Sequence, residues 1–197
     1  MRSLLGVIAA AVALGGTFAS APAPAPSPTP PGSRAAVPPR DNHLLVRGPT
    51  YVYNRAYAGA RTTVAAYAGR GGRATVVFVV TGMPRSTWGR RFGVHVHTNR
   101  CGRDPAAAGP HYANPRAPRG ATLAEREIWL DVRVLPGGIG VSRHTSTYPL
   151  PSDIQANSVV LHAQPTNTVT GDAGARVLCT TISLANIPRP AVSRSRG

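Results

Sequence analysis

The stretch Phe92-Gly93-Val94-His95-Val96-His97 alternates in the way that a half-buried β-strand requires. Side chains two residues apart in a strand point to the same face, so Val94 and Val96 are expected to face the core. His95 and His97 then share the opposite face, about 7 Å apart at their Cα atoms, where both could bind one metal ion. Because an isolated His-x-His pair often arises by chance, this stretch alone predicts a strand and only suggests a metal site.

Other stretches of the chain have the same strand period. They are residues 50–58, 62–68, 74–81, 127–135, 138–145, 158–162 and 176–184. Turn-forming residues separate several of them, as in Gly69-Arg70-Gly71-Gly72 and Pro136-Gly137-Gly138. No segment has a sustained helical face. This pattern predicts an all-β, immunoglobulin-like domain, an antiparallel Greek-key sandwich or barrel.

One long irregular loop, residues 98–126, interrupts the strands and is rich in Pro, Gly and Ala. A loop of this length inside a compact domain is unusual unless it has a function. It contains Cys101 and His111. We therefore expect it to contribute to a site.

The two ends of the chain differ from its middle. Residues 1–21 have an early arginine, a short apolar run and then Ala19-Ser20-Ala21, the layout of a signal peptide, although an uncleaved anchor is the alternative. Residues 22–40 are a Pro/Ala-rich linker expected to be disordered, and residues 188–197 a basic disordered tail. The β domain is then residues 41–187, in a protein that is secreted or lies in the periplasm or cell envelope.

The net charge of +15 is carried by arginine, with no lysine in the chain. Such a surplus suits nucleic acid, an anionic cell envelope or a small anionic substrate. The arginines are scattered, and no recognition helix or aromatic platform accompanies them, which argues against nucleic acid. A solvated basic surface, with electrostatic association with the anionic envelope left open, is the simpler interpretation.

Cys101 and Cys179 are the only cysteines. In an exported protein an isolated pair most simply forms a disulfide, and metal ligation or catalysis is the alternative. A disulfide here would close a loop of about 80 residues and stabilise the fold by about 4–5 kcal/mol on the chain-entropy model.

Three fragments supply imidazoles that could converge with an arginine. They are His95-Val96-His97, Gly109-Pro110-His111 and Val159-Val160-Leu161-His162, and the arginine is Arg176. Imidazole nitrogens suit copper, and an anchored arginine beside a metal would attract a small anion. Each histidine alone is weak support, but together they predict one redox metal site. His43 and His144 match no ligand pattern, and we expect both to be exposed.

The same motifs, taken in order, are similar to those of a known family. His95-Val96-His97 and Ser158-Val159-Val160-Leu161-His162-Ala163 resemble its copper-ligand strands. Cys101 followed by Ala108-Gly109-Pro110-His111-Tyr112 resembles its disulfide cysteine and its metal-bridging histidine. Gly171-Asp172-Ala173-Gly174-Ala175-Arg176-Val177-Leu178-Cys179 resembles the segment with its superoxide-guiding arginine and second cysteine. From about residue 73 to about residue 185, the chain thus resembles the secreted bacterial branch of the copper/zinc superoxide dismutase family.

The resemblance implies an eight-stranded Greek-key fold and an enzyme that converts superoxide to dioxygen and hydrogen peroxide. It implies one copper ion held by four histidines, His95, His97, His111 and His162. In zinc-containing relatives the bridging histidine is thought to leave copper on reduction and carry a proton, which would make His111 catalytic. Arg176 would dock the superoxide anion, and Cys101 would pair with Cys179.

The chain also departs from the family. The zinc-containing members provide two more histidines and an aspartate after the bridging histidine, but residues 112–133 contain no histidine. Glu127 and Asp131 stand near these positions, and two carboxylates without imidazole are a poor zinc site. The charged loop of the family is reduced here to residues 163–170, without a charge. The chain therefore resembles the copper-only members, and we expect no zinc.

Glu127 and Asp131 are then expected to support the copper ligands, with Glu127 hydrogen-bonded to His111. Solvated or arginine-paired carboxylates are the alternative. The alternative functions are a copper-buffering envelope protein without fast turnover and a metal-free adhesion protein. The oligomeric state stays open, with a monomer favoured.

Overall fold

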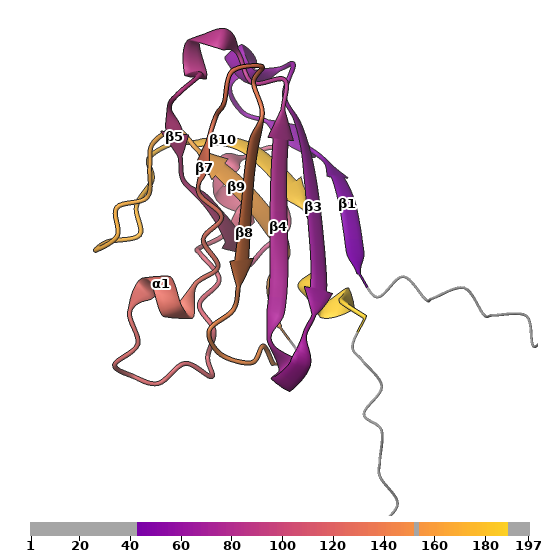
Figure 1. Cartoon of the computed structure of the whole chain (residues 1–197), viewed down its shortest axis with the longest axis vertical. Helices are drawn as coiled ribbons and strands as arrows, with labels where there is room; N and C mark the ends of the chain where they lie inside the picture. The colour runs from indigo at the N-terminus through magenta and orange to yellow at the C-terminus, as the bar shows by residue number, and fades with distance from the viewer. Residues whose placement is uncertain (1–42, 152–153, 189–197) are drawn as a thin grey trace, which may run out of the picture. The chain divides into compact units, whose positions relative to one another are not determined.

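The strands form two four-stranded antiparallel sheets and a two-stranded ribbon in a computed structural model (Figure 1). The structure describes residues 43–151 and 154–188, which belong to one compact unit. The predicted signal peptide and linker, and the predicted tail beyond Pro188, lie outside the described residues. No helix within the described ranges is long and apolar enough to cross a membrane.

The first sheet has the order β1-β3-β4-β8. Its strands are β1 (Leu44–Gly48), β3 (Arg61–Ala68), β4 (Ala74–Thr81) and β8 (Gly140–Thr145). Val46, Val64 and Phe78 lie opposite one another in register, and Val64 and Phe78 are buried on the inner face. Alternation of buried and more exposed residues along β3 and β4 gives this sheet one core face.

The second sheet has the order β2-β10-β9-β6. Its strands are β2 (Tyr51–Val52), β10 (Arg176–Thr181), β9 (Ser158–His162) and β6 (Val94–His97). Every residue of β6 and β9 is buried, since the core covers one face and other segments of the chain cover the opposite face. Val94 and Val96 belong to the main core, as predicted, which leaves His95 and His97 on the opposite face.

The ribbon consists of β5 (Arg91–Phe92) and β7 (Val132–Arg133). Gly93 separates β5 from β6, and a Cβ atom there would lie 2.5 Å from the Cβ of Ala173 and 2.7 Å from Oγ1 of Thr166. Glycine at position 93 therefore lets the loop 163–170 lie close to the strand.

The short helices are η1 (Arg55–Tyr57), η2 (Arg70–Gly72), η3 (Arg85–Thr87), η4 (Pro105–Ala108), α1 (Leu123–Arg126) and η5 (Leu184–Asn186).

The predicted all-β fold is confirmed, and the two larger sheets together contain eight strands. Strand β1 was not predicted. The predicted strand at residues 50–58 ends at Val52, because Asn54 accepts a hydrogen bond from the backbone of Ala56 and begins η1. The predicted strand at residues 127–135 is shorter, and Glu127 and Trp129 form only single bridges, to Ala113 and His95.

His144 does not have the exposed position that we expected. It lies opposite the buried Val76 on the inner side of β8 and is half-buried. Burial lowers the pKa of His144, although a hydrogen bond to the backbone of Trp129 opposes the shift. His43 is exposed, as expected.

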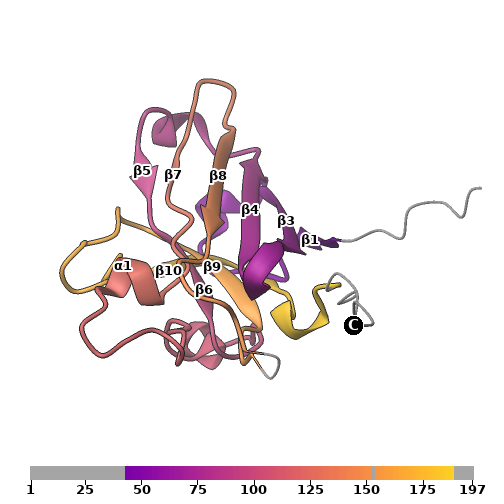
Figure 2. The same cartoon turned by 60° about the horizontal axis from the view of Figure 1, so that its bottom comes forward.

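The disulfide between Cys101 and Cys179 is present. It joins the long loop to β10 and packs with Ala108, Val160 and Tyr53 in a small cluster, separate from the main core. Figure 2 shows the loop segment with α1 on the same side of the domain as β6, β9 and β10. The disulfide therefore fixes this loop beside the strands that carry the histidines.

Candidate metal centre

The structure brings the four predicted ligands together on the outer side of the second sheet. His95 and His97 lie in β6, and His162 ends β9. His111, in the long loop, forms an isolated backbone β-bridge with His97. One side-chain nitrogen from each lies within 4.8 Å of the other three. His95, His97 and His162 are buried, and His111 is partly exposed. The site is thus deep, with one more accessible ring.

Backbone carbonyls determine which nitrogen of His97 and His162 carries the proton. Nδ1 of His97 lies 2.9 Å from the carbonyl oxygen of Gly109, and Nδ1 of His162 lies 3.0 Å from that of Gly174. A carbonyl only accepts, so both Nδ1 atoms are the N–H donors. The two Nε2 atoms, 3.2 Å apart, therefore direct lone pairs toward each other.

His111 is oriented by a carboxylate. Its Nδ1 lies 2.9 Å from Oε2 of Glu127, and Nε1 of Trp129 donates to the same oxygen at 2.7 Å. Burial raises the pKa of Glu127, but these two hydrogen bonds and the Coulombic interactions with His111 and Arg126 together hold the pKa below its usual value. An ionised Glu127 fixes the proton of His111 on Nδ1, so Nε2 of His111 carries a lone pair, 2.9 Å from Nδ1 of His95.

His95 is oriented by a hydroxyl group. Its Nε2 lies 2.7 Å from Oγ1 of Thr166, and that hydroxyl donates to Oδ1 of Asp131 at 2.7 Å. The backbone N–H groups of Thr166 and Val94 also donate to Asp131, each at 3.2 Å. Because the hydroxyl proton of Thr166 points to Asp131, its oxygen accepts from Nε2 of His95, and Nδ1 of His95 has the free lone pair.

Four lone pairs therefore converge on one point. Burial, with smaller effects from the neighbouring rings, lowers the pKa of His95 to about 2. Burial likewise lowers the pKa of His97 to about 3 and that of His162 to about 4, although hydrogen bonds to backbone carbonyls oppose both shifts. The lone pairs of these three histidines therefore stay free of protons near neutral pH.

A metal ion fits this arrangement. With metal–nitrogen bonds of about 2.0–2.1 Å, adjacent ligand nitrogens lie about 3 Å apart and opposite ones about 4 Å. The observed separations of 2.9 and 3.2 Å match adjacent ligands, and the 4.8 Å limit on the remaining separations is somewhat wider than an opposite pair requires. Four imidazoles suit copper, and a tetragonal set of nitrogens is typical of Cu(II).

Arg176 is anchored beside the histidines. Its guanidinium donates to the carbonyl oxygens of Pro105, at 2.5 Å, and Gly109, at 2.6 Å. Arg176 lies opposite His162 in the β10–β9 register. The carbonyl of Gly109 accepts from both Arg176 and His97, so the arginine is held next to a ligand. A fixed positive charge there can attract an anion.

Glu127 and Asp131 do not face a common point. Glu127 contacts His111 and Trp129, whereas Asp131 contacts Thr166 and the backbone, with its Oδ1 3.8 Å from Nε2 of His95. Among the described residues, the four histidines are the set of His, Cys, Asp and Glu side chains placed to hold one ion.

The sequence did not reveal several supporting groups. Thr166 lies in the uncharged loop 163–170 and Trp129 in the stretch 127–135, and neither matches a ligand motif. The carbonyls of Gly109 and Gly174 carry no side-chain signal, although both glycines lie within the quoted motifs. Residue type could not identify these groups, because their contribution depends on where the chain places a hydroxyl, an indole or a carbonyl.

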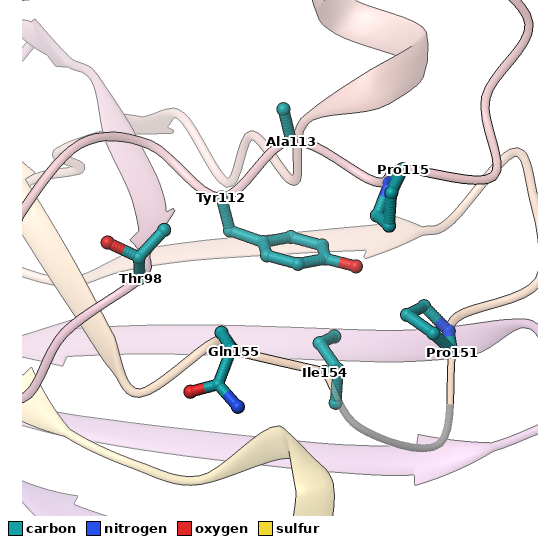
Figure 3. Close-up of a pocket in the computed structure, with 7 residues that line it drawn as sticks. All are labelled: Thr98, Tyr112, Ala113, Pro115, Pro151, Ile154 and Gln155. Atoms are coloured by element: carbon teal, nitrogen blue, oxygen red, sulfur yellow. The ribbon is translucent and has the colours of Figure 1, made fainter.

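A pocket of about 270 Å³ lies near the centre but is separate from it. Figure 3 shows the ring of Tyr112, which follows His111 in sequence, facing Ile154 and Gln155 across this pocket. None of the four histidines lines it. The pocket therefore adds nothing to the metal centre.

Comparisons with known proteins give a likeness in fold. No family model and no curated protein sequence matches the chain. The crystal structure of the clock protein EA4 is 17% identical, covers 71% of this chain and 91% of its own, and superposes with a TM-score of 0.50. Candida albicans superoxide dismutase 5 in its Cu(II) form is also 17% identical, covering 72% of this chain and 93% of its own, with a TM-score of 0.43. A mutant form of the same Candida protein is 18% identical, covering 72% and 92%, with a TM-score of 0.42. At these identities the likeness to EA4 shows a shared fold, and the two weaker superpositions carry no further argument.

Proposed function

We propose that this chain is a copper-dependent superoxide dismutase that acts outside the cytoplasm and has no zinc site. The observation that carries the proposal is the convergence of four imidazole nitrogens beside an anchored arginine. The motif resemblance of residues 73–185 supports the same function. The disulfide is consistent with an oxidising location.

The donor set favours copper over zinc as the working metal. Zinc has no redox chemistry, whereas copper bound by imidazoles can take up and release one electron. Bound copper would supply the electron acceptor for one superoxide, released as dioxygen, and the electron donor for a second, released with two protons as hydrogen peroxide.

Arg176 positions the anion. Its guanidinium is held by two carbonyls, so its charge does not have to be ordered when the anion arrives. The net charge of +15 supplies long-range attraction, which decreases as ionic strength rises. The chain's own charge can thus replace the steering function of a longer charged loop.

His111 is the residue best placed to hold a proton for the product. It is the most exposed of the four rings, and Glu127 fixes its Nδ1–H. Its Nε2 faces the cluster, so a proton at that atom would lie next to the bound anion. Glu127 acts through His111 as a positioning residue, because its hydrogen bond holds the Nδ1–H and turns Nε2 toward the cluster.

The test is a superoxide-dismutation assay on one preparation divided into metal-free, copper-loaded and zinc-loaded samples. We expect activity in the copper-loaded sample alone, with close to one copper bound per chain. Equal activity after removal of copper would contradict the proposal. Zinc binding at a second stoichiometric site would contradict the absence of a zinc site.

The second candidate is a copper-buffering protein, favoured by the uncharged loop at residues 163–170. A copper-storage protein does not need an arginine that docks anions. The two candidates are separated by Arg176→Ala measured beside the parent protein. A large loss of dismutation with unchanged copper content supports the enzyme, whereas slow parent turnover that is insensitive to the substitution supports buffering.

A further inference from the structure

Four large apolar side chains are exposed close to the turn that joins β7 to β8. They are Trp88, 37% exposed, Leu135, 53%, Ile139, 43%, and Val141, 60%. We call this group the hairpin tip. Leu135 and Ile139 form an antiparallel bridge, so their side chains are neighbours, and Val141 follows two residues later on the same face. Exposed apolar groups gathered in this way indicate an interaction surface.

Hydrogen bonds hold Trp88 at the same end of the domain. The backbone N–H of Gly89 donates to the carbonyl of Val134 at 2.7 Å, and that of Met83 donates to Gly138 at 3.1 Å. Figures 1 and 2 show η3 and the β7–β8 turn together at one end of the domain. The guanidinium of Arg85 lies over the Trp88 ring, 5.5 Å from its centre. The indole and aliphatic groups of the tip therefore lie next to a positive charge, that of Arg85.

Two more arginines adjoin the tip. Arg91 and Arg133 are opposite each other in the β5–β7 register, and both are exposed. Like charges at opposed positions repel, so such a pair is stabilised when an anion lies beside it. Within the described part of the chain, neither arginine forms an ion pair with a carboxylate. Asp131, two residues before Arg133, has its oxygens occupied by Thr166 and Val94.

We infer that the hairpin tip docks onto the surface of an anionic phospholipid membrane, with Trp88, Leu135 and Ile139 entering the interfacial layer. Indole rings favour that layer, and arginines next to it contact anionic headgroups. A second copy of the chain fits less well, because it would bring two more arginines against Arg91 and Arg133. A soluble anionic polymer would leave the apolar groups uncovered. This inference does not depend on the proposed enzymatic function.

The test uses the full chain with vesicles of phosphatidylcholine and with vesicles that also contain phosphatidylglycerol. We expect binding to the mixed vesicles that weakens as salt is added. Leu135→Ser/Ile139→Ser should lower the partition coefficient about tenfold or more. Arg91→Gln and Arg133→Gln should each lower it about fivefold. The matched control is Val169→Ser, since Val169 is 82% exposed on a different loop.

Thermal unfolding checks that the variants remain folded, as expected because the substituted side chains are exposed. A second readout is quenching of tryptophan fluorescence by brominated lipid, which should fall in Trp88→Phe because Trp129 is the only other tryptophan. Binding by the parent that the tip variants and the control retain equally would overturn the inference, as would equal binding to uncharged vesicles. A change in oligomeric state without any effect on vesicle binding would overturn it in favour of a second copy.

Discussion

Replacing Thr166 by valine keeps the shape of the side chain but removes the hydroxyl that accepts from His95. In the parent protein, Nε2 of His95 has this oxygen 2.7 Å away, and the His95 ring is fully buried. A buried donor left without an acceptor costs about 1–3 kcal/mol, and loss of a group that orients a metal ligand lowers metal affinity about 10- to 100-fold. We expect Thr166→Val to lower the free energy of unfolding of the metal-free protein by that amount, measured in urea, and copper affinity by that factor, measured by competition titration.

Thr166→Ser is the matched control, because it restores the hydroxyl with a smaller side chain. The serine variant should recover both copper affinity and the nitrogen chemical shifts of His95 that report a proton on Nε2. A general packing defect would affect valine and serine in the opposite order, since valine fills the space better. If the valine variant matches the parent in stability, copper affinity and His95 tautomer, the role of Thr166 as a positioning residue is wrong.

Three further outcomes are expected. In the metal-free protein, burial lowers the pKa of the three buried histidines to between about 2 and 4, whereas the unfolded chain takes up protons near pH 6.5. The unfolded state therefore binds more protons, and the free energy of unfolding should fall as pH is lowered from about 6.5 toward 4. The fall should be up to about 1.4 kcal/mol per pH unit for each histidine. Urea titrations in which the free energy of unfolding does not change over this pH range would contradict the prediction. Cys101→Ser/Cys179→Ser should lower the free energy of unfolding by about 4–5 kcal/mol and reduce turnover as well, and full turnover in the folded variant would exclude coupling between the disulfide and the site. Arg176→Ala should lower kcat/KM about tenfold or more and reduce the salt dependence of kcat/KM at unchanged copper content. Arg176→Lys is the control that keeps the charge. Equal salt dependence of kcat/KM in the parent and both variants would contradict a guiding role of Arg176.

Strand periodicity predicted the fold well where both faces of a strand have a clear environment. Ala74–Thr81 and Ser158–His162 were predicted with the bounds that the structure has. Leu44–Gly48 was missed because it is short, lies at a sheet edge and contains two large exposed residues, Leu45 and Arg47. Glu127 and Trp129 alternate like strand residues, but their side chains are used around the histidines, and the backbone there forms only isolated bridges.

The ligand set was easier to predict than its surroundings. Imidazoles are rare and have few alternative uses in a β domain, so their positions within motifs were informative. The contact of Glu127 with His111 followed from an unoccupied nitrogen that needed an acceptor. The contribution of Thr166 could not be predicted, because a threonine in a loop can form many different hydrogen bonds. The close approach of this loop to Gly93 brings the Thr166 hydroxyl next to His95.

The carbonyl of Gly109 has a consequence for any attempt to change the site by mutation. This one oxygen accepts from Nδ1 of His97 and from the guanidinium of Arg176. When two donors share one acceptor oxygen, each hydrogen bond weakens the other. The electron density that His97 offers to a metal therefore depends on the hydrogen bond from Arg176. Removing the guanidinium would let the oxygen bond more strongly to His97, making that imidazole more electron-rich. If the proposed function holds, anion docking by Arg176 and the reduction potential of a bound metal would therefore be coupled through a single peptide group.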